Sequence, residues 1–392
     1  MPRITLVRGA RQLLTLHGPA GPRRGADLRN LGLIQDGAIL IVDGLIQEVG
    51  SSRRVENLAL ARQADEIDAS GRVVMPGFVD SHMHIVGEPG LAAPRTLQRR
   101  ALNVLEEAVR HGTTTMEAKS GFDLAEAGEI KILRVHQALE KQPISLVSTF
   151  LATPLAAEYK KGPDEYLEWV CSRMLPLVKR RKLAEFADIR CEEGAFERKH
   201  ARRYLIAARD LGFGLKMHTG QRSSAGAIRL AVEFEAISVD HAVDASQDDA
   251  LLLAQSNTIA TLLPGVNFYL GAEPYAPARM LINGGVAVAL ATNYNAETSP
   301  SQNMQMMLTL ACRKMNMTPA EAVTAATLNA AHALRRASRI GSLEAGKNAD
   351  LIILGVPDYR EIPYHFGINL VDLVMKNGSV VVERAEVKWP VS

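Results

Sequence analysis

The sequence predicts an α/β protein: a (β/α)8 TIM-like barrel with a small, sandwich-like β-rich domain formed by both ends of the chain. Two observations indicate this fold class. From residue 77 onward, short apolar segments alternate with helical segments until eight strands have passed. Both chain ends instead read as short strands and turns. Regular alternation of strand and helix is typical of a parallel barrel, and the two strand-rich ends can build one separate domain.

Residues 1–76 are expected to form the N-terminal part of the β-rich domain. They contain the segments ITLVRG, GAILIVDGLIQEVG and EIDASGRVVMPG, in which β-branched residues are interrupted by Asp-Gly and Ser-Gly turn signals. Residues 346–392 return to this pattern in ADLIILGV and VDLVMKNGSVVVERAEV. We therefore expect the C-terminal segment to complete the same domain.

Residues 77–345 are expected to form the barrel. We place its strands, in chain order, at GFVDSHMHI, TTTMEAK, ISLVSTFLA, FADIRCEE, LKMHTG, SVDHA, TIATLLPG and VAVALATN. Helical segments lie between them, among them TLQRRALNVLEEAVRHG, HARRYLIAARDLG and AGAIRLAVEFEA. In barrels of this kind the functional side chains gather at the carboxyl ends of the strands.

Composition excludes several classes of partner. The chain is 47% hydrophobic and 22% charged, and its formal net charge is +2, so we expect neither nucleic acid nor membrane as a partner. We find no signal-peptide pattern at the N-terminus and no apolar run of the ~20 residues that a membrane span needs. Three scattered cysteines, Cys171, Cys191 and Cys312, favour a reducing, cytoplasmic setting.

Histidines at the ends of predicted strands indicate a metal centre. His82 and His84 are two residues apart in DSHMHI, which sends both rings to the same face of a strand. His218 and His241 end two later strands, in LKMHTG and SVDHA. Buried, hydrogen-bonded histidines are the alternative, but four polar rings at one end of a barrel would be costly without a shared ligand. We predict one divalent metal ion, zinc or iron, held by His82, His84 and His218.

The whole chain resembles the amidohydrolase superfamily and, within it, the imidazolonepropionase family. The resemblance is carried by MPGFVDSHMH, HGTTTMEAKSGFDL, CEEGAF, LKMHTGQRSSAG, LLPGVNFYL, SPSQNMQMMLTLAC, IGSLEAGKNADLIIL and PYHFGIN. It implies a homodimer, a single metal ion on His82, His84 and His218, and a catalytic histidine at His241. It also implies that water attacks a five-membered cyclic amide.

The chain departs from that family at several site positions. The family's aspartate at the end of the last strand, a metal ligand and base, aligns with Asn293. Its glutamate after the third metal histidine aligns with Gln221, and a substrate-facing tyrosine aligns with Phe122. A family histidine corresponds to Thr153 or Pro154, and the family's carboxylate-binding arginine after the paired histidines has no counterpart. The scaffold is kept, whereas the substrate contacts differ.

These departures change the expected mechanism. Asn293 can ligate a metal ion or orient a water molecule through its carbonyl oxygen, but it cannot accept a proton. We expect proton transfer by His241, which titrates near working pH, or by Glu193 in RCEEG; an ion pair is the alternative role for Glu193.

Three further side chains are candidate substrate contacts. Gln221 can both donate to and accept from a ring that presents a carbonyl next to an N–H, and Phe122 would face the substrate. Lys119 could hold a substrate carbonyl or carboxylate, or form a salt bridge at the rim. Arg95 and Arg222 are the candidate partners of an acidic substrate group.

Three functional hypotheses follow. The first is a metal-dependent hydrolase of a non-peptide C–N bond in a five-membered cyclic amide, for example a hydantoin- or thiohydantoin-like ring. The second is true imidazolonepropionase activity through a rearranged site. The third is a metal-containing barrel that binds a ligand without turning it over.

Overall fold

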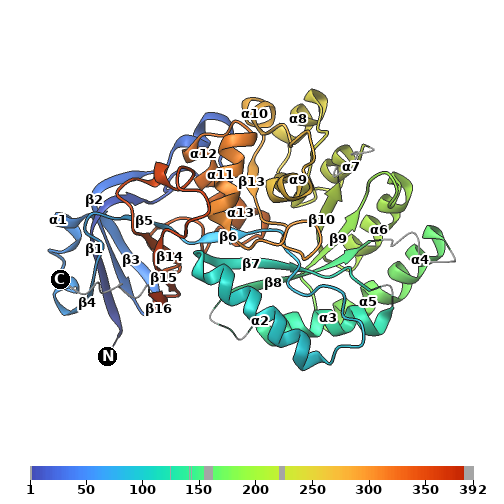
Figure 1. The fold of residues 1–392 in the computed structure, drawn as a ribbon, viewed down its shortest axis with the longest axis horizontal. Helices are drawn as coiled ribbons and strands as arrows, with labels where there is room; N and C mark the ends of the chain where they lie inside the picture. Colours follow the sequence, from blue (N-terminus) through green and yellow to red (C-terminus); the bar gives the residue numbers. More distant parts are fainter. Residues whose placement is uncertain are drawn as a thin grey trace, which may run out of the picture.

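The computed structural model describes residues 2–123, 125–140, 142, 144–153, 162–219 and 226–383. The described strands form two separate eight-stranded sheets, one from both ends of the chain and one from its middle (Figure 1). The predicted fold class, a (β/α)8 barrel with a β-rich domain from the chain ends, is confirmed. Among the described residues, no helix combines the length and the apolar character needed to cross a membrane.

The barrel sheet is parallel and follows the order of the chain. Its strands are β6 (Phe78–Asp80), β7 (Thr113–Lys119), β8 (Ser145–Ala152), β9 (Phe186–Arg190), β10 (Gly214–Thr219), β11 (Ser238–His241), β12 (Ile259–Leu262) and β13 (Val288–Leu290). All eight lie where the sequence places them. β6 and β13 are shorter than expected, so that His82 and His84 follow β6 and are not part of it.

The first and last barrel strands meet just beyond their ends. The Thr292 hydroxyl and backbone N–H donate to the two carboxylate oxygens of Asp80, at 2.5 and 3.1 Å. The backbone N–H of His84 donates to the carbonyl of Tyr294, at 2.8 Å, and Met83 and Tyr294 form an isolated parallel bridge. These contacts close the barrel at its carboxyl end, where the site is expected.

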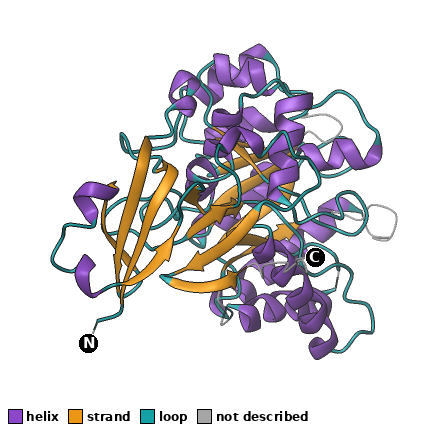
Figure 2. Cartoon of the chain, turned by 60° about the vertical axis from the view of Figure 1, so that its left-hand side comes forward, coloured by secondary structure: helices purple, strands orange, loops and turns teal. Residues whose placement is uncertain are grey.

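Helices cover the outside of the barrel, as Figure 2 shows. Helix α1 (Ser52–Val55) belongs to the β-rich domain, and the other described helices are α2 (Pro94–Arg110), α3 (Glu126–Leu139), α4 (Pro163–Trp169), α5 (Leu175–Arg180), α6 (Arg198–Asp210), α7 (Ala227–Glu233), α8 (Gln247–Ala254), α9 (Pro264–Leu270), α10 (Ala278–Asn283), α11 (Met304–Lys314), α12 (Pro319–Ala325) and α13 (Leu328–Ala333). A π-helical segment, Val170–Met174, joins α4 to α5. In α2 the buried residues Leu97, Ala101, Leu105 and Ala108 recur at helical spacing and pack against the outer face of the barrel sheet.

The β-rich domain joins strands from both chain ends. It contains β1 (Ile4–Leu14), β2 (Leu33–Val42), β3 (Leu45–Ser51), β4 (Asp65–Asp68), β5 (Val73–Pro76), β14 (Leu351–Leu354), β15 (Val371–Lys376) and β16 (Ser379–Glu383). β14 pairs with β5 and so connects the two ends. Its core is aliphatic and includes Val7, Ile39, Val74, Leu351 and Met375.

The interior of the barrel is polar, which the sequence pattern explains. Along β7, Thr113, Thr115, Glu117 and Lys119 alternate with Thr114, Met116 and Ala118. Because side chains of a strand alternate between its faces, Glu117 and Lys119 share one face, and their contacts lie inside the barrel. The polar interior lies directly below the carboxyl-end mouth of the barrel.

Candidate metal centre and active site

Four histidines converge at the carboxyl-end mouth of the barrel. His82 and His84 follow β6, His218 lies on β10 and His241 ends β11. The ring of His82 lies 5.5 Å from His84, 5.2 Å from His218 and 5.8 Å from His241, measured between centroids. His218 and His241 are only 4.4 Å apart. All four side chains are buried.

An unusual backbone conformation brings His241 into this group. Asp240 and His241 are neighbours in β11, so regular strand geometry would point them to opposite faces. His241 has a φ of +75° and Ala242 a φ of +48°, a region that residues with a side chain rarely adopt. The strand therefore turns at its last residue. This lets Asp240 lie in the barrel interior while the ring of His241 lies at the mouth.

Five buried atoms at the mouth have no hydrogen-bond partner among the described residues. They are Nε2 of His82, Nδ1 of His84, Nδ1 of His218, Nε2 of His241 and Oδ1 of Asn293. Buried polar atoms are normally satisfied, so a cluster of unsatisfied ones calls for a missing partner. Candidate ligand nitrogens of His82, His218 and His241 all lie within 4.8 Å of one another. Nitrogen and carbonyl-oxygen donors of this kind fit a divalent metal ion.

Burial keeps the four imidazoles neutral. It lowers the pKa of His84 and of His241 to about 3, with the charge of Lys119 adding to the effect at His84. The pKa values of His82 and His218 lie well below the usual value for the same reason. A neutral imidazole has a nitrogen lone pair and can ligate a metal ion without first losing a proton.

Asn293 lies at the seam where the barrel closes. Its backbone N–H donates to the carbonyl of His82, at 2.9 Å, and its φ of +51° is in the left-handed region that asparagine tolerates. The side chain is buried, and its Oδ1 is one of the five unsatisfied atoms. The amide oxygen is therefore available to a metal ion or to a water molecule.

A cavity of about 350 Å³ opens beside these groups. Its wall includes His84, His218 and Asn293 together with Phe122, Thr153 and Arg190. The rings of Phe122 and His84 meet edge to face, 5.0 Å apart. The Arg190 guanidinium is held by the buried carboxylate of Glu192, at 2.5 to 2.6 Å, and two exposed glutamates, Glu88 and Glu297, line the rim. This volume suits a small, ring-sized ligand.

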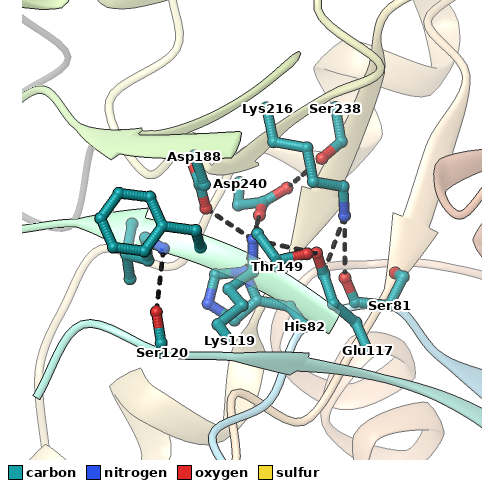
Figure 3. Close-up of polar contacts among 12 residues, drawn as sticks. Ser81, His82, Glu117, Lys119, Ser120, Thr149, Asp188, Lys216, Ser238 and Asp240 are labelled. Carbon is teal, nitrogen blue, oxygen red and sulfur yellow. Dashed lines mark hydrogen bonds and ion pairs between the residues drawn. The ribbon is translucent and has the colours of Figure 1, made fainter. Parts of the chain in front are cut away.

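A buried charge network lies beneath the mouth (Figure 3). The Lys119 ammonium contacts Asp188 at 2.6 Å, Asp240 at 3.1 Å and Glu117 at 3.5 Å. Asp240 in turn contacts Nδ1 of His82 at 2.6 Å. A second ammonium group, that of Lys216, contacts Glu117 at 2.7 Å. The network therefore connects the barrel interior to one histidine of the cluster.

The sequence profile of the amidohydrolase family matches residues 73–381. Over 416 residues the chain is 40% identical to the imidazolonepropionase of Alkaliphilus metalliredigens, with 97% of this chain and 99% of that protein covered. It is also 40% identical to the imidazolonepropionase of Geobacillus kaustophilus, with 98% and 99% covered. The chain belongs to the amidohydrolase family.

Solved structures confirm that this amidohydrolase has a fold found in other enzymes. An adenosine deaminase from Xanthomonas campestris, solved with zinc, has a TM-score of 0.72 at 17% identity, with 97% of this chain and 93% of that chain covered. An atrazine chlorohydrolase from Arthrobacter aurescens, also solved with zinc, has a TM-score of 0.75 at 18% identity, with 97% and 95% covered. At these identities the likeness concerns the fold alone.

Of two expectations for this amidohydrolase's histidines, one stays a prediction and one is wrong. His82, His84 and His218 remain the predicted ligands, while the compact set in the structure contains His82, His218 and His241. His84 lies beside that set. The expectation that His241 titrates near neutral pH is wrong, because burial lowers its pKa to about 3.

Other expected site residues lie away from the cavity. Lys119 is fully buried among carboxylates and is not part of the cavity wall, so the expected substrate contact is replaced by an interior role. Glu193 is exposed beside the buried Glu192, and Arg95 is exposed on α2; neither is part of the cavity wall. Gln221, Arg222 and Pro154 lie outside the described residues.

Arg190 and the interior acids were not predicted from the sequence. Arg190 ends β9 within FADIRCEE, and its position at a strand end was a usable signal. Asp188 lies two residues earlier, on the same face, and Asp240 immediately precedes His241. Period-2 spacing could have placed Asp188 inside the barrel, but the contact between Asp240 and His82 depends on the turn at His241.

Proposed function

We propose that this amidohydrolase opens a five-membered cyclic amide by hydrolysing a non-peptide C–N bond, using one divalent metal ion at the histidine cluster. The observation that carries the proposal is the group of five buried nitrogen and oxygen atoms that have no hydrogen-bond partner and could ligate a metal ion, beside a ring-sized cavity. The similarity to imidazolonepropionases along nearly the whole chain supports the reaction class.

His82 and His218 are the proposed common ligands, because they belong both to the set that the family resemblance implies and to the compact set in the structure. The third histidine ligand is either His241, which belongs to the compact set in the structure, or His84, which the family resemblance implies. When bound, a divalent metal ion would supply Lewis acidity for the amide carbonyl and for the attacking water. Zinc is supported by the zinc in two structural neighbours, and iron is the alternative.

With Asn293 in place of an aspartate, the residue that binds the metal ion or the water cannot also be the residue that accepts the proton. Its carbonyl oxygen can accept a hydrogen bond from the attacking water or ligate the metal ion, but it cannot take up the proton. The histidine that does not ligate the metal ion is the proposed proton carrier. His84 is well placed for this role because it lines the cavity, next to Phe122. Because burial lowers its pKa to about 3, it would hold the proton only transiently, between the attacking water and the leaving nitrogen.

The proposed substrate is a ring with an acidic substituent, such as a hydantoin- or thiohydantoin-like propionate. Arg190 lines the cavity while its Nε and Nη2 contact the Glu192 carboxylate, and its guanidinium is the proposed charge-assisted partner of the acidic substituent. Phe122 provides an apolar surface for the ring. Imidazolone propionate itself is the second candidate substrate, supported by the names of the curated relatives.

The test combines metal analysis with a substrate panel. Purified protein should contain about one divalent metal ion per chain, and hydantoin-5-propionate or its 2-thio analogue should be hydrolysed faster than imidazolone propionate. A kcat/KM of ~10⁵ M⁻¹s⁻¹ or more for imidazolone propionate would instead assign true imidazolonepropionase activity. Metal-loaded protein that binds these rings and hydrolyses none of them would identify a binding protein.

Alanine variants separate ligand from proton carrier. His82→Ala and His218→Ala should lose the metal ion. Of His84→Ala and His241→Ala, the variant that keeps the metal ion should lose turnover by ~10²–10⁴-fold, the usual contribution of a general acid–base group. We further propose a homodimer, on the family resemblance, which sedimentation analysis of the purified protein would check.

A further inference from the structure

Two lysines are fully buried inside the barrel, although an ammonium group is among the most costly groups to bury. Lys119, on β7, contacts Asp188, Asp240 and Glu117, and Lys216, on β10, contacts Glu117. Both are paired, which offsets part of the cost of removing their charges from water. Neither lines the cavity, so their function is not direct contact with a substrate.

The two lysines differ in what they reach. Lys119 contacts Asp240, whose second oxygen accepts a hydrogen bond from the Ser238 hydroxyl at 2.7 Å. The Asp240 oxygen that faces Lys119 also contacts Nδ1 of His82, at 2.6 Å. Lys216 contacts Glu117 and the carbonyl of Ser81, and neither of these contacts involves Asp240 (Figure 3).

The contact between Asp240 and His82 determines which nitrogen of the His82 ring carries the proton. A carboxylate at Nδ1 accepts the N–H of that nitrogen, so that Nε2 carries the lone pair. Nε2 of His82 is the buried, unsatisfied atom on the side of the histidine cluster. The Asp240 carboxylate can accept this hydrogen bond only if it is held against Nδ1 of His82. The backbone turns sharply at the next residue, His241, so regular strand geometry does not hold it there.

We propose that Lys119 is a positioning residue for the metal centre: by holding the Asp240 carboxylate against Nδ1 of His82, it presents Nε2 of His82 to the metal ion. The inference rests on the metal site proposed above. Lys119 is not part of the cavity wall and would act on the site through Asp240. Lys216 is equally buried in the same network, but its hydrogen bonds and ion pair go to Glu117 and Ser81, and it influences Asp240 only through its charge. It serves as the internal control.

The test uses two charge-balanced double variants. Lys119→Met with Asp188→Asn removes the lysine that holds Asp240 together with one of its carboxylate partners. Lys216→Met with Glu117→Gln removes the other lysine and its partner; Glu117 also lies 3.5 Å from the Lys119 ammonium, but the contact of Lys119 with Asp240 is left in place. Each pair deletes one positive and one negative buried charge, so their general effects on folding are matched. The readout is the dissociation constant for Zn²⁺ alone, measured by competition with a chromogenic chelator, with folding checked by circular dichroism.

The Lys119 pair should bind Zn²⁺ about 10- to 100-fold more weakly than the unmodified protein, which is the usual effect of removing support from a metal-ligating histidine. The Lys216 pair should remain within about threefold of it. Equal weakening in both pairs, or none in either, would overturn the proposal. If the unmodified protein binds no metal ion, the proposed function fails instead.

If the Lys119 pair does not fold, Asp240→Asn tests the same connection with a side chain of the same shape. It should also weaken Zn²⁺ binding by about 10- to 100-fold, because an amide is a poorer acceptor for Nδ1–H than a carboxylate. In the cobalt(II)-substituted protein, the visible absorption bands should shift relative to the unmodified protein. A Zn²⁺ affinity equal to that of the unmodified protein would overturn the proposal.

Discussion

At the scale of single residues, the positions of the site side chains could be predicted from the sequence, whereas the contacts among them could not. The histidines and Asn293 were predictable because each follows a recognisable barrel strand. The place of His241 in the compact set was not predictable, since it depends on the positive φ of His241. Lys119 was placed at the rim because it ends β7, yet its face of the strand points into the barrel.

Asn293→Asp should tighten metal binding. The substitution places a carboxylate next to a cation and leaves the left-handed backbone conformation acceptable. Asn293→Gly keeps that conformation and removes the oxygen, so the Zn²⁺ affinities should rank Asp above Asn above Gly, with about tenfold between neighbours. Chelator competition measures the series. Equal affinities for all three would show that the side chain does not contact the metal ion.

Arg190→Met should select against acidic substrates. The loss of a charge-assisted contact costs about 1.5–3 kcal/mol, equivalent to about 10- to 100-fold in kcat/KM for hydantoin-5-propionate. Hydantoin, which has no carboxylate, should be affected much less. Arg190→Lys, which keeps the charge without the paired N–H geometry, should give an intermediate loss. A parallel decline for both rings would place the substrate's acidic group elsewhere.

At the scale of elements, the helix α3 determines the shape of one cavity wall. Its residue Glu129 is buried, and its carboxylate accepts hydrogen bonds from the backbone N–H groups of Gly121, Phe122 and Asp123, at 2.9 to 3.1 Å. This ties the segment after β7 to the helix that follows it and holds Phe122 against His84. The sequence showed the strand and the helix, but the pairing of one carboxylate with three backbone groups is a tertiary contact that no periodicity reveals.

Glu129→Gln should flatten the pH dependence of stability. Burial raises the pKa of Glu129 from 4.5 to about 7, so the folded protein holds a proton that the unfolded chain releases from pH 4.5 upward. The stabilisation from this group is therefore complete below pH 4.5 and is lost as pH rises through about 7. At ~1.4 kcal/mol per pKa unit the loss is about 3 kcal/mol at most.

Denaturant unfolding of the metal-free protein across pH 4.5–8 checks this prediction. The variant should lose less stability over that interval than the unmodified protein, because glutamine does not titrate. Asp80, another buried acid whose pKa is raised to about 7, keeps its own contribution in both proteins. If the free energy of unfolding changes with pH in the same way in both proteins, Glu129 is not the source of the pH dependence.

At the scale of the whole molecule, the sequence predicted both the barrel and the split β-rich domain. Eight strands separated by helices leave few other arrangements, and the two strand-rich ends pair through β5 and β14. What it could not predict is how the two sheets connect. Lys376 on β15 pairs with Asp350, and its ammonium lies 3.4 Å from the Thr115 hydroxyl on β7. The groups involved are far apart in the chain and carry no local signal.

Lys376→Met should destabilise the protein without changing its metal site. The variant leaves the buried Asp350 carboxylate without its cation, which costs about 3–5 kcal/mol. Adding Asp350→Asn removes the uncompensated charge and should restore part of the lost stability. Thermal unfolding of the metal-free proteins measures this cycle, and Zn²⁺ affinity serves as the control. A double variant less stable than Lys376→Met alone would contradict the pairing.

The contact that closes the barrel determines when, during synthesis of the chain, the metal site can form. Asp80 and Thr292, whose contact closes the barrel, are 212 residues apart. During synthesis, His82 and His84 leave the ribosome long before Asn293 exists, so the five donor atoms cannot assemble on an unfinished chain. A nascent chain should therefore compete poorly for cellular metal, and metal uptake should follow translation. Circular permutation that joins the ends of the chain and reopens it in the segment between α6 and β10 would change this order of synthesis while leaving the closed barrel the same.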